Sequence, residues 1–474
     1  MQNRRRSVSA AVLFVPRTCI PLEKEVMDVV LLTRLTNFLW NPWLLGLFLV
    51  VGLVYSLGSG FFQLFGLRRW VRATLGALFR KRDKPGGGLS SLQALATALA
   101  STMGTGSIAG VATALTLGGP GAIFWMWVSA FLGMMTGCGE KLLSVRYQRP
   151  APGGGLQGGP MFYLRDGLRS PLLAAWFSLA CLPATLAGGD LVQSSSIASS
   201  LEAALGLNRL FVGVVTALLA GLVMVGGIGR IARVSSALVP AMALLYLGSG
   251  TAVLVLRASA LPDALRLIFS CALSPAAAVG GGAGWTVASA LRYGVARGVF
   301  TNEAGLGSAP IAHAAAETDS PVKQGFWGMF EVFLSTLVVC TITALVILVS
   351  GVWRPGVPGA LTGAPLTAAA FGSALGPAGE VVVALSLLLF AFSSILGWSY
   401  YGQQCLRFLT GGDRLLPLYR ALFLACTLLG ALWEPTVVWL LVDLCNALMA
   451  IPNLAALLLL APQALSLLDQ WQKA

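Results

Sequence analysis

The chain has 474 residues, of which 57% are hydrophobic and 10% charged, whereas an ordinary soluble domain carries about 25% charged residues. With a mean hydropathy of +0.81, so few charges cannot cover the surface of a soluble protein of this size. The composition excludes a cytosolic enzyme, a disordered protein and an outer-membrane barrel, whose strands give a much weaker apolar signal. It predicts an all-α polytopic membrane protein, because each spanning helix needs about 20 mainly apolar residues.

The net charge of +13 comes from 31 Lys and Arg against 18 Asp and Glu. We attribute this excess to cytoplasmic loops, which collect basic residues in membrane proteins, and not to a nucleic-acid partner. The eight cysteines form no C-x-x-C pair, and His313 is the single histidine. The sequence therefore predicts no zinc site, no disulfide framework and no bound cofactor.

Apolar segments divide the chain into eleven expected membrane helices. An N-terminal extension (1–42) is expected to precede an extra helix (43–66) and a basic loop (67–88). The other ten segments are 89–117, 120–143, 171–204, 210–228, 234–256, 286–316, 325–352, 379–406, 416–432 and 436–461. We group them as a first five-helix repeat (89–257), a second (286–462) and a tail (463–474).

The basic residues set the expected orientation. If the loop at 67–88 is cytoplasmic, 19 Lys and Arg fall in inside loops and 4 in outside loops. This bias predicts a multi-pass protein of the plasma (inner) membrane with its N-terminus outside and its C-terminus in the cytoplasm. The basic residues within 1–26 oppose that orientation, so we expect Met27 to be the native start; a peptide from residues 1–26 in the cellular protein would contradict this.

Two segments read as interrupted helices, at Met103–Ser107 and at Asn302–Pro310. They stand about 200 residues apart, and each opens a set of five helices. Corresponding breaks in two five-helix sets are typical of inverted repeats, whose broken helices hold a substrate at the midplane. Half-helix N-termini attract a carboxylate, and freed carbonyls attract small cations. A zwitterionic amino acid together with Na⁺ satisfies both.

Several polar residues lie in otherwise apolar helices. Glu303, at the second break, is expected to cap backbone N–H groups, to pair with Arg297 or to serve transport directly. Asp190 and Gln193, three residues apart, are expected to share a helix face in a pore or in helix packing. Further such residues are Ser393 and Ser394, which can bond their own helix or a cation, Trp398, which can wall a pocket, and Asp443, near Asn446.

Colinear runs from about residue 40 onward resemble the alanine/glycine:cation (sodium:alanine) symporter family. The runs are Gly104–Ala112, Gly118–Trp127, Gly158–Tyr163, Arg297–Gly305, Ser393–Gly402 and Met449–Leu454. The resemblance implies a LeuT-type fold of 11 transmembrane helices with 5+5 inverted repeats and two broken helices. It also implies import of a small neutral amino acid, alanine or glycine, with Na⁺.

The resemblance assigns roles by position. Thr105, Gly106 and Ser107 would meet the substrate carboxylate. The residues that would shape the pocket are Gln193, Phe300, Asn302 and Trp398. The sodium ligands would be carbonyls of Ala100, Met103 and Phe390 and hydroxyls of Ser393 and Ser394, an oxygen set that suits a hard cation. Glu303 and Gly305 would serve structure and gating.

Three positions depart from the family pattern. Ser107 replaces an Asn, Ser335 stands in place of the Asp of an Asp-Thr pair, and Gln403 replaces a Glu. Lost carboxylates remove cation partners, and Glu331, one turn before Ser335, is a candidate replacement. Restoring Asp at position 335 is expected to strengthen transport or its Na⁺ dependence, and an indifferent variant would argue against this reading.

Other classes of function fit less well. A divergent member that binds or equilibrates amino acids without ion coupling remains the alternative. A channel needs a filter-like run, and an enzyme needs a nucleophile with a base or a metal cluster; neither is evident. No G-x-x-x-x-G-K-[ST] loop indicates ATP-driven transport.

Overall fold

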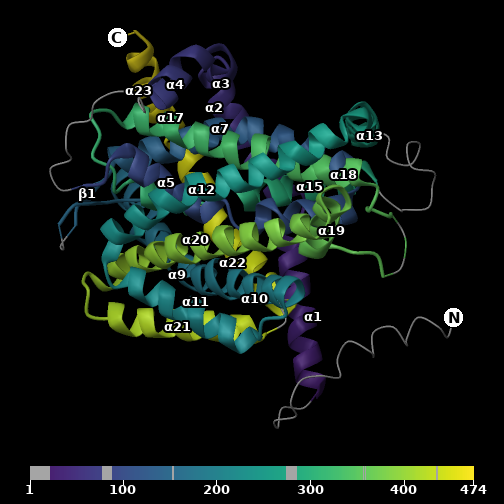
Figure 1. Ribbon diagram of the computed structural model, residues 1–474. Coiled ribbons are helices and arrows are strands. Elements are labelled where there is room, and N and C mark those ends of the chain that lie inside the picture. Colours follow the sequence, from purple (N-terminus) through teal and green to yellow (C-terminus); the bar gives the residue numbers. More distant parts are fainter. Residues whose placement is uncertain are drawn as a thin grey trace.

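Helices form nearly all of the described chain in this computed structural model, which describes residues 22–76, 88–151, 154–273, 286–355, 357, 359–433 and 436–473 (Figure 1). In the first half the elements are α1 (Leu22–Leu39), α2 (Pro42–Gly58), α3 (Phe62–Phe65), α4 (Leu67–Thr74), α5 (Ser91–Thr102), η2 (Thr105–Ser107), α6 (Ala109–Gly118), α7 (Gly121–Arg146), β1 (Arg149–Pro150), β2 (Leu156–Gln157), α8 (Pro160–Phe162), η3 (Tyr163–Gly167), α9 (Pro171–Leu186), η4 (Ala187–Leu191), α10 (Val192–Leu205), α11 (Arg209–Met224) and α12 (Gly227–Leu256).

The second half continues in the same way. Its elements are η5 (Ala258–Ala260), α13 (Leu261–Leu273), α15 (Val287–Asn302), α16 (Ala309–His313), α17 (Pro321–Val332), η6 (Phe333–Cys340), α18 (Thr341–Ser350), α19 (Gly363–Leu375), α20 (Pro377–Thr410), α21 (Leu416–Leu432), α22 (Thr436–Leu459) and α23 (Ala461–Lys473). The short elements η3, η4 and η6 are π-helical turns, and η2 and η5 are 3₁₀ turns.

Within the described residues, seven helical stretches are long and apolar enough to cross a membrane. They are Leu31–Gly58, Gly121–Arg146, Pro171–Leu205, Gly227–Leu256, Pro321–Ser350, Pro377–Thr410 and Val438–Leu459. Three shorter apolar helices accompany them, namely α6, α11 and α21. The protein is therefore a helical, polytopic membrane protein, as its composition predicts.

Both expected interruptions are present. Helix α5 begins at a capping box, in which Ser90 and Gln93 satisfy each other's backbone N–H groups. It ends at Met103, and η2 intervenes before α6. The second interruption separates α15 from α16, and Glu303 there adopts the left-handed conformation with φ of 56°, which is strained for a residue with a side chain.

Small residues let the central helices approach closely. A Cβ atom at Gly294 of α15 would lie 2.3 Å from the carbonyl oxygen of Ala122 on α7. On α17, a Cβ at Gly328 would lie 2.8 Å from the carbonyl oxygen of Gly137 on α7. Glycine is required at these contacts because backbone meets backbone, a common device between membrane helices. Helix α7 is thereby held between α15 and α17.

The N-terminal helices lie along α22. Trp40 Nε1 donates to the carbonyl oxygen of Asp443 at 2.7 Å, and the Tyr55 hydroxyl donates to that of Leu457 at 2.9 Å. Helix α1 falls inside the region expected to be an extension (1–42), so helical structure begins earlier than expected. The expectation that residues 1–26 are not native falls mainly on residues 1–21, which lie outside the described residues.

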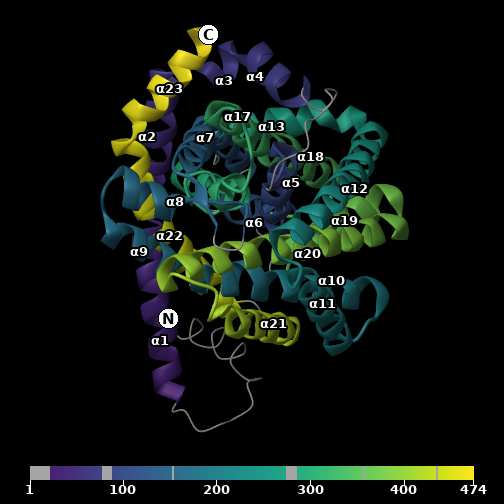
Figure 2. The same ribbon diagram turned by 90° about the vertical axis from the view of Figure 1, so that its left-hand side faces the viewer.

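Helices α3, α4 and α23 gather at one end of the molecule, where the C-terminus also lies, in both views (Figures 1 and 2). Trp70 of α4 contacts Phe333 edge-on with ring centroids 6.3 Å apart, and Trp471 of α23 meets Phe326 at 4.7 Å. The start of the basic loop and the C-terminal tail therefore share one end, as the charge pattern requires.

Candidate functional site

The break after α5 exposes backbone to a neighbouring helix. The Thr105 N–H donates to Gln193 Oε1 of α10 at 3.3 Å, and Gln193 Nε2 donates to the carbonyl oxygen of Gly188 at 3.1 Å. A Cβ atom at Gly104 would lie 2.6 Å from Ser394 Oγ, and one at Gly106 would lie 3.0 Å from the Phe300 ring. Glycine at these two positions lets the backbone reach the side chains around it.

A small cavity of about 20 Å³ lies at this break. It brings together four of the predicted substrate-binding residues, Gly106, Gln193, Phe300 and Trp398, with Glu303, which is predicted to serve structure and gating. Its other lining residues are Ser101, Thr102, Gly104, Gly188, Leu306 and Asn446. Thr105, Ser107 and Asn302 are fully or almost fully buried beside it but do not line it. The volume is room for about one water molecule.

Three buried polar atoms at the two breaks have no hydrogen-bond partner within the described chain: Thr105 Oγ1 and Ser107 Oγ at the first break, and Asn302 Nδ2 at the second. The Asn302 Oδ1 atom, by contrast, accepts from the N–H of Ala304 at 3.0 Å. Since buried polar groups in native proteins are almost always paired, these atoms mark places where a ligand can supply the partner.

The predicted sodium ligands on α5 and α20 meet. Ser393 Oγ donates to the carbonyl oxygens of Ala100 (3.0 Å) and Phe390 (2.9 Å). Ser394 Oγ contacts the carbonyl oxygens of Ala100 (3.1 Å) and Ser101 (3.0 Å). Met103 is fully buried at the end of α5. Hydroxyl and carbonyl oxygens that converge on one point form a donor set that suits a hard cation.

At the second break, Glu303 turns away from the expected basic partner. Its carboxylate accepts a hydrogen bond from the hydroxyl of Ser308. Arg297 instead lies over the rings of Phe300 and Trp439, at 5.8 and 5.4 Å from their centroids. Of the alternatives for Glu303, the pair with Arg297 is therefore wrong, because the carboxylate is engaged by Ser308 and residues six positions apart do not face each other on a helix.

Gly305 has a structural reason to be glycine. Its φ is +93°, and a Cβ atom there would lie 2.6 Å from the Phe48 ring of α2. Its N–H donates to Glu140 Oε1 of α7 at 2.9 Å, and its carbonyl oxygen accepts from Asn453 Nδ2 of α22 at 2.9 Å. Three helices thus hold the broken segment through one residue.

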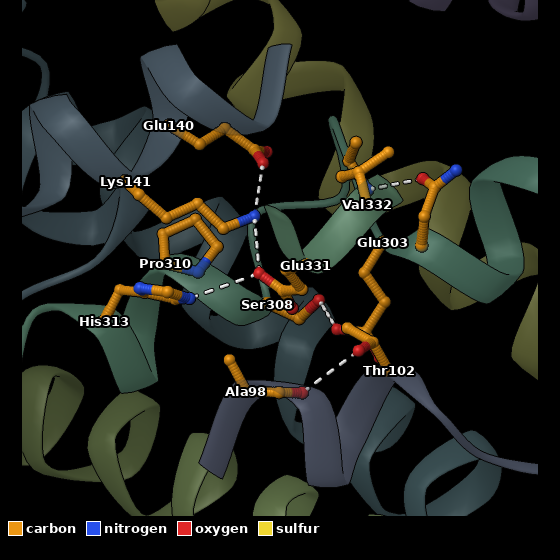
Figure 3. Close-up of polar contacts among 12 residues, drawn as sticks. Ala98, Thr102, Glu140, Lys141, Glu303, Ser308, Pro310, His313, Glu331 and Val332 are labelled. Atoms are coloured by element: carbon orange, nitrogen blue, oxygen red, sulfur yellow. Dashed lines mark hydrogen bonds and ion pairs between the residues drawn. The ribbon is translucent and has the colours of Figure 1, made fainter. Parts of the chain in front are cut away.

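A buried ionic network beside this break was not anticipated. Lys141 Nζ lies 3.4 Å from both Glu140 Oε2 and Glu331 Oε2, and all three side chains are fully buried (Figure 3). Glu331 Oε2 also lies 3.2 Å from His313 Nε2. In the charge count Lys141 is placed in a cytoplasmic loop, which is wrong because its side chain is fully buried within α7; without it the bias becomes 18 to 4. The signal available in the sequence was an adjacent Glu–Lys pair at the end of an apolar segment.

The fourth expected membrane segment contains a π-helical turn that separates two polar residues. Asp190 lies in η4 and accepts from Thr427 Oγ1 of α21 at 2.8 Å, whereas Gln193 turns toward Thr105. The prediction that they share a face is wrong, since the π turn changes the angle between positions three apart. Asp190 therefore contributes to helix packing and does not line the cavity.

The three positions that depart from the family pattern are all buried. Thr343 Oγ1 donates to the Ser107 carbonyl oxygen at 2.9 Å, and Ser335 Oγ contacts only its own helix, at Val332. Gln403 Oε1 accepts from Arg420 at 2.8 and 3.0 Å. Glu331, the candidate replacement for an Asp at position 335, contacts Lys141 and His313 through Oε2.

The sequence is similar to one family of known proteins along nearly its whole length. The model of a family described as the sodium:alanine symporter family matches residues 24–474. The sodium/alanine symporter AgcS of Methanococcus maripaludis is 42% identical over 442 residues, which cover 92% of this chain and 95% of that protein. An uncharacterized transporter of Haemophilus influenzae is 44% identical over 431 residues (90% and 92%), and the probable sodium/glutamine symporter GlnT of Bacillus subtilis is 36% identical over 441 residues (92% and 89%).

Among solved structures, the manganese transporter of Eremococcus coleocola superposes with a TM-score of 0.51 at 16% identity, over 79% of this chain and 77% of that one. This likeness concerns the fold alone. The match along nearly the whole chain and the identity to AgcS carry the assignment: the chain belongs to the sodium:alanine symporter family.

Proposed function

We propose that the protein is a secondary symporter that imports a small neutral amino acid, alanine or glycine, together with Na⁺ by alternating access. Family membership supports Na⁺-coupled transport of amino acids. The observation that carries the site is a set of buried atoms without a hydrogen-bond partner in the described chain: Thr105 Oγ1 and Ser107 Oγ at the first break, and Asn302 Nδ2 at the second. These hydroxyl and amide groups can each donate a hydrogen bond, so the carboxylate of a bound amino acid is a partner that suits all of them.

In this proposal Thr105, Gly106 and Ser107 receive the substrate carboxylate at the first break, where freed N–H groups favour negative charge. The side chains of Gln193, Phe300, Asn302 and Trp398 shape the pocket around it. Sodium is held by the carbonyls of Ala100, Met103 and Phe390 and the hydroxyls of Ser393 and Ser394. Because Ala100 and Met103 lie at the end of α5, directly before the turn η2 that carries Thr105, ion binding orders the segment that receives the substrate.

The size of the cavity bears on both substrate and mechanism. Space for about one water is too small for any amino acid, so the walls must move apart for binding and release. Alanine and glycine require the smallest movement. Although the relatives include a probable glutamine symporter by name, the small cavity favours the shorter side chains.

We further propose the LeuT-type arrangement of 11 membrane helices, with inverted repeats at 89–257 and 286–462 after the extra helix. The corresponding breaks after α5 and α15 support it. Because each repeat has an odd number of helices, the second repeat crosses the membrane in the opposite orientation to the first. The protein lies in the plasma (inner) membrane with its N-terminus outside and its C-terminus in the cytoplasm. The remaining charge bias of 18 to 4 supports this orientation.

The test is uptake of radiolabelled alanine, glycine and glutamine into proteoliposomes, with an inward Na⁺ gradient and with K⁺ in its place. We expect accumulation of alanine or glycine above the external concentration only with Na⁺. Flux that equilibrates regardless of Na⁺ would identify an uncoupled facilitator instead. Binding without flux would identify a sensor.

A further inference from the structure

The single histidine of the chain closes a buried chain of titratable groups that the proposed sodium and substrate sites do not use. His313 lies in α16, directly after the second break, and is fully buried. Its Nε2 faces Glu331 Oε2 at 3.2 Å, and its Nδ1 lies 2.7 Å from Gln324 Nε2 (Figure 3). An amide nitrogen can only donate, so in this arrangement Nδ1 accepts and the imidazole is neutral, with its proton on Nε2.

The same residues have a second arrangement. Gln324 Oε1 is buried and has no hydrogen-bond partner within the described chain. If the amide rotates by a half turn, Oε1 faces Nδ1 and accepts a proton from it, and the imidazole becomes a cation that donates at both nitrogens. One added proton on His313 Nδ1 therefore satisfies an acceptor that otherwise has no partner.

The charges around His313 favour that proton. Helix α7 contributes Glu140 and Lys141, α17 contributes Glu331, and the break contributes Glu303, all buried. Helix α20 contributes Tyr401, and α5 has no titratable side chain. If the imidazole is neutral, Lys141 is the single cation beside two ionised carboxylates, Glu140 and Glu331. An ionised Glu303 would add to this excess of negative charge. Protonation of His313 offsets one buried negative charge that has no counter-ion.

A metal ion is the other way to offset such a charge. Within the described residues no group of three His, Cys, Asp or Glu side chains is placed to hold one. Glu331 Oε1 also has no hydrogen-bond partner there and is fully buried. A proton on the imidazole is the simpler counter-charge for the pair His313–Glu331.

We propose that His313 and Glu331, with Gln324 as a reversible partner, form a proton-binding site that couples protonation to transport. This inference rests on the proposed function and extends it by a second ligand. The proton bound at His313 draws Glu331 toward the imidazolium and weakens its hold on Lys141. Lys141 is shared with Glu140, which holds the N–H of Gly305. The proton therefore acts on the broken segment, in which Glu303 and Ser308 lie between the ion pair and Thr102 (Figure 3).

The first test measures the protonation state of the His313 imidazole directly. Because the chain has one histidine, protein purified without a histidine tag and labelled with ¹⁵N-histidine gives one imidazole signal set in nanodiscs. We expect a change from the neutral to the protonated form between about pH 5 and pH 8, the range in which histidine acts as a switch, and a shift of that change when Na⁺ and alanine are added. An imidazole that keeps one protonation state across the range overturns the proposal, as does a titration that ignores both ligands.

The second test measures how transport depends on pH. Na⁺-driven alanine uptake by the unmodified protein is expected to vary severalfold over the same pH range, whereas uptake by H313Q stays constant. The matched control is K323Q on α17, the helix of Glu331 and Gln324; it removes a surface pair with Asp319, which precedes that helix, and is expected to keep the unmodified pH profile. If H313Q does not fold, E331Q provides the same comparison. Equal pH profiles in H313Q and the unmodified protein overturn the proposal, whereas absence of uptake in every Na⁺ gradient instead contradicts the proposed function.

Discussion

Gly104 occupies the position where backbone, sodium ligands and substrate pocket come closest. A Cβ atom there would lie 2.6 Å from Ser394 Oγ and 3.2 Å from Gln193 Oε1. An added methyl therefore pushes against one residue of the cation site and one of the pocket. Overpacking of this kind costs about 1–3 kcal/mol, and we expect that cost to fall on the contact between the break, the cation site and the pocket.

We expect G104A to lower Na⁺-driven alanine uptake by roughly tenfold or more, since each 1.4 kcal/mol corresponds to about a factor of ten. The matched control is G110A on α6, where a Cβ atom meets nothing within 4 Å. Uptake by both variants in proteoliposomes, corrected for the amount of folded protein, checks this. Equal uptake by G104A and G110A would show that the break does not approach Ser394 during transport.

At the scale of the element, the π-helical turn η4 places Asp190 against α21. Asp190 Oδ1 accepts from Thr427 Oγ1 at 2.8 Å, while Oδ2 has no hydrogen-bond partner in the described chain. Replacement of Thr427 by Val keeps the shape and removes the donor, so a buried carboxyl group loses its one side-chain partner. Such a loss costs about 1–3 kcal/mol.

T427V is accordingly expected to unfold at a lower temperature than the unmodified protein in detergent. The control S196A removes a hydroxyl that bonds only its own helix, at the Val192 carbonyl oxygen, and should leave the unfolding temperature nearly unchanged. Thermal unfolding followed by tryptophan fluorescence measures both. A T427V protein as stable as S196A would mean that Asp190 is satisfied in some other way.

Asp166 of η3, which lies outside the long membrane helices, accepts hydrogen bonds from Arg165 and from Arg149 of β1. This contact predicts that stability depends on pH. Hydrogen bonds from Arg165, and secondarily from Arg149, hold the pKa of Asp166 below its ordinary value of 3.8. A carboxyl group whose pKa is lower in the folded state stabilises the fold above the unfolded pKa. That contribution is lost as the pH falls through the folded value.

We therefore expect D166N to be less stable than the unmodified protein near neutral pH. The difference should narrow once the pH falls below about 4, where the unfolded carboxyl group of Asp is protonated as well. Thermal unfolding of both proteins across this range tests the sign of the effect. A difference that widens toward acid pH would contradict the assignment of Asp166 as an ionised partner of the two arginines.

For the molecule as a whole, patterns that repeat along the chain predicted more than single residues did. Apolar length predicted the membrane helices, and glycine-rich interruptions predicted both breaks. The contact between Ser393 and the Ala100 carbonyl followed the positions that the resemblance assigned. The Glu140–Lys141 pair was missed because its partners come from α16, α17 and α22, which only the tertiary fold brings together. Asp190 was misplaced because a π turn leaves no clear mark in sequence spacing.

Orientation in the membrane is the property of the whole molecule that remains to be measured. Arg354, in the loop after α18, and Lys473, at the end of α23, are both exposed and fall on opposite sides in the proposed topology. Of the seven cysteines in the described chain, six are buried and Cys426 is partly buried, so a cysteine introduced on the surface should dominate labelling. We expect a membrane-impermeant maleimide to label R354C on intact cells, and K473C only after permeabilisation. The unmodified protein measures the background, including any from Cys19. The reverse pattern would invert the topology and place the basic loop at 67–88 outside the cell, against the charge bias from which the orientation is argued.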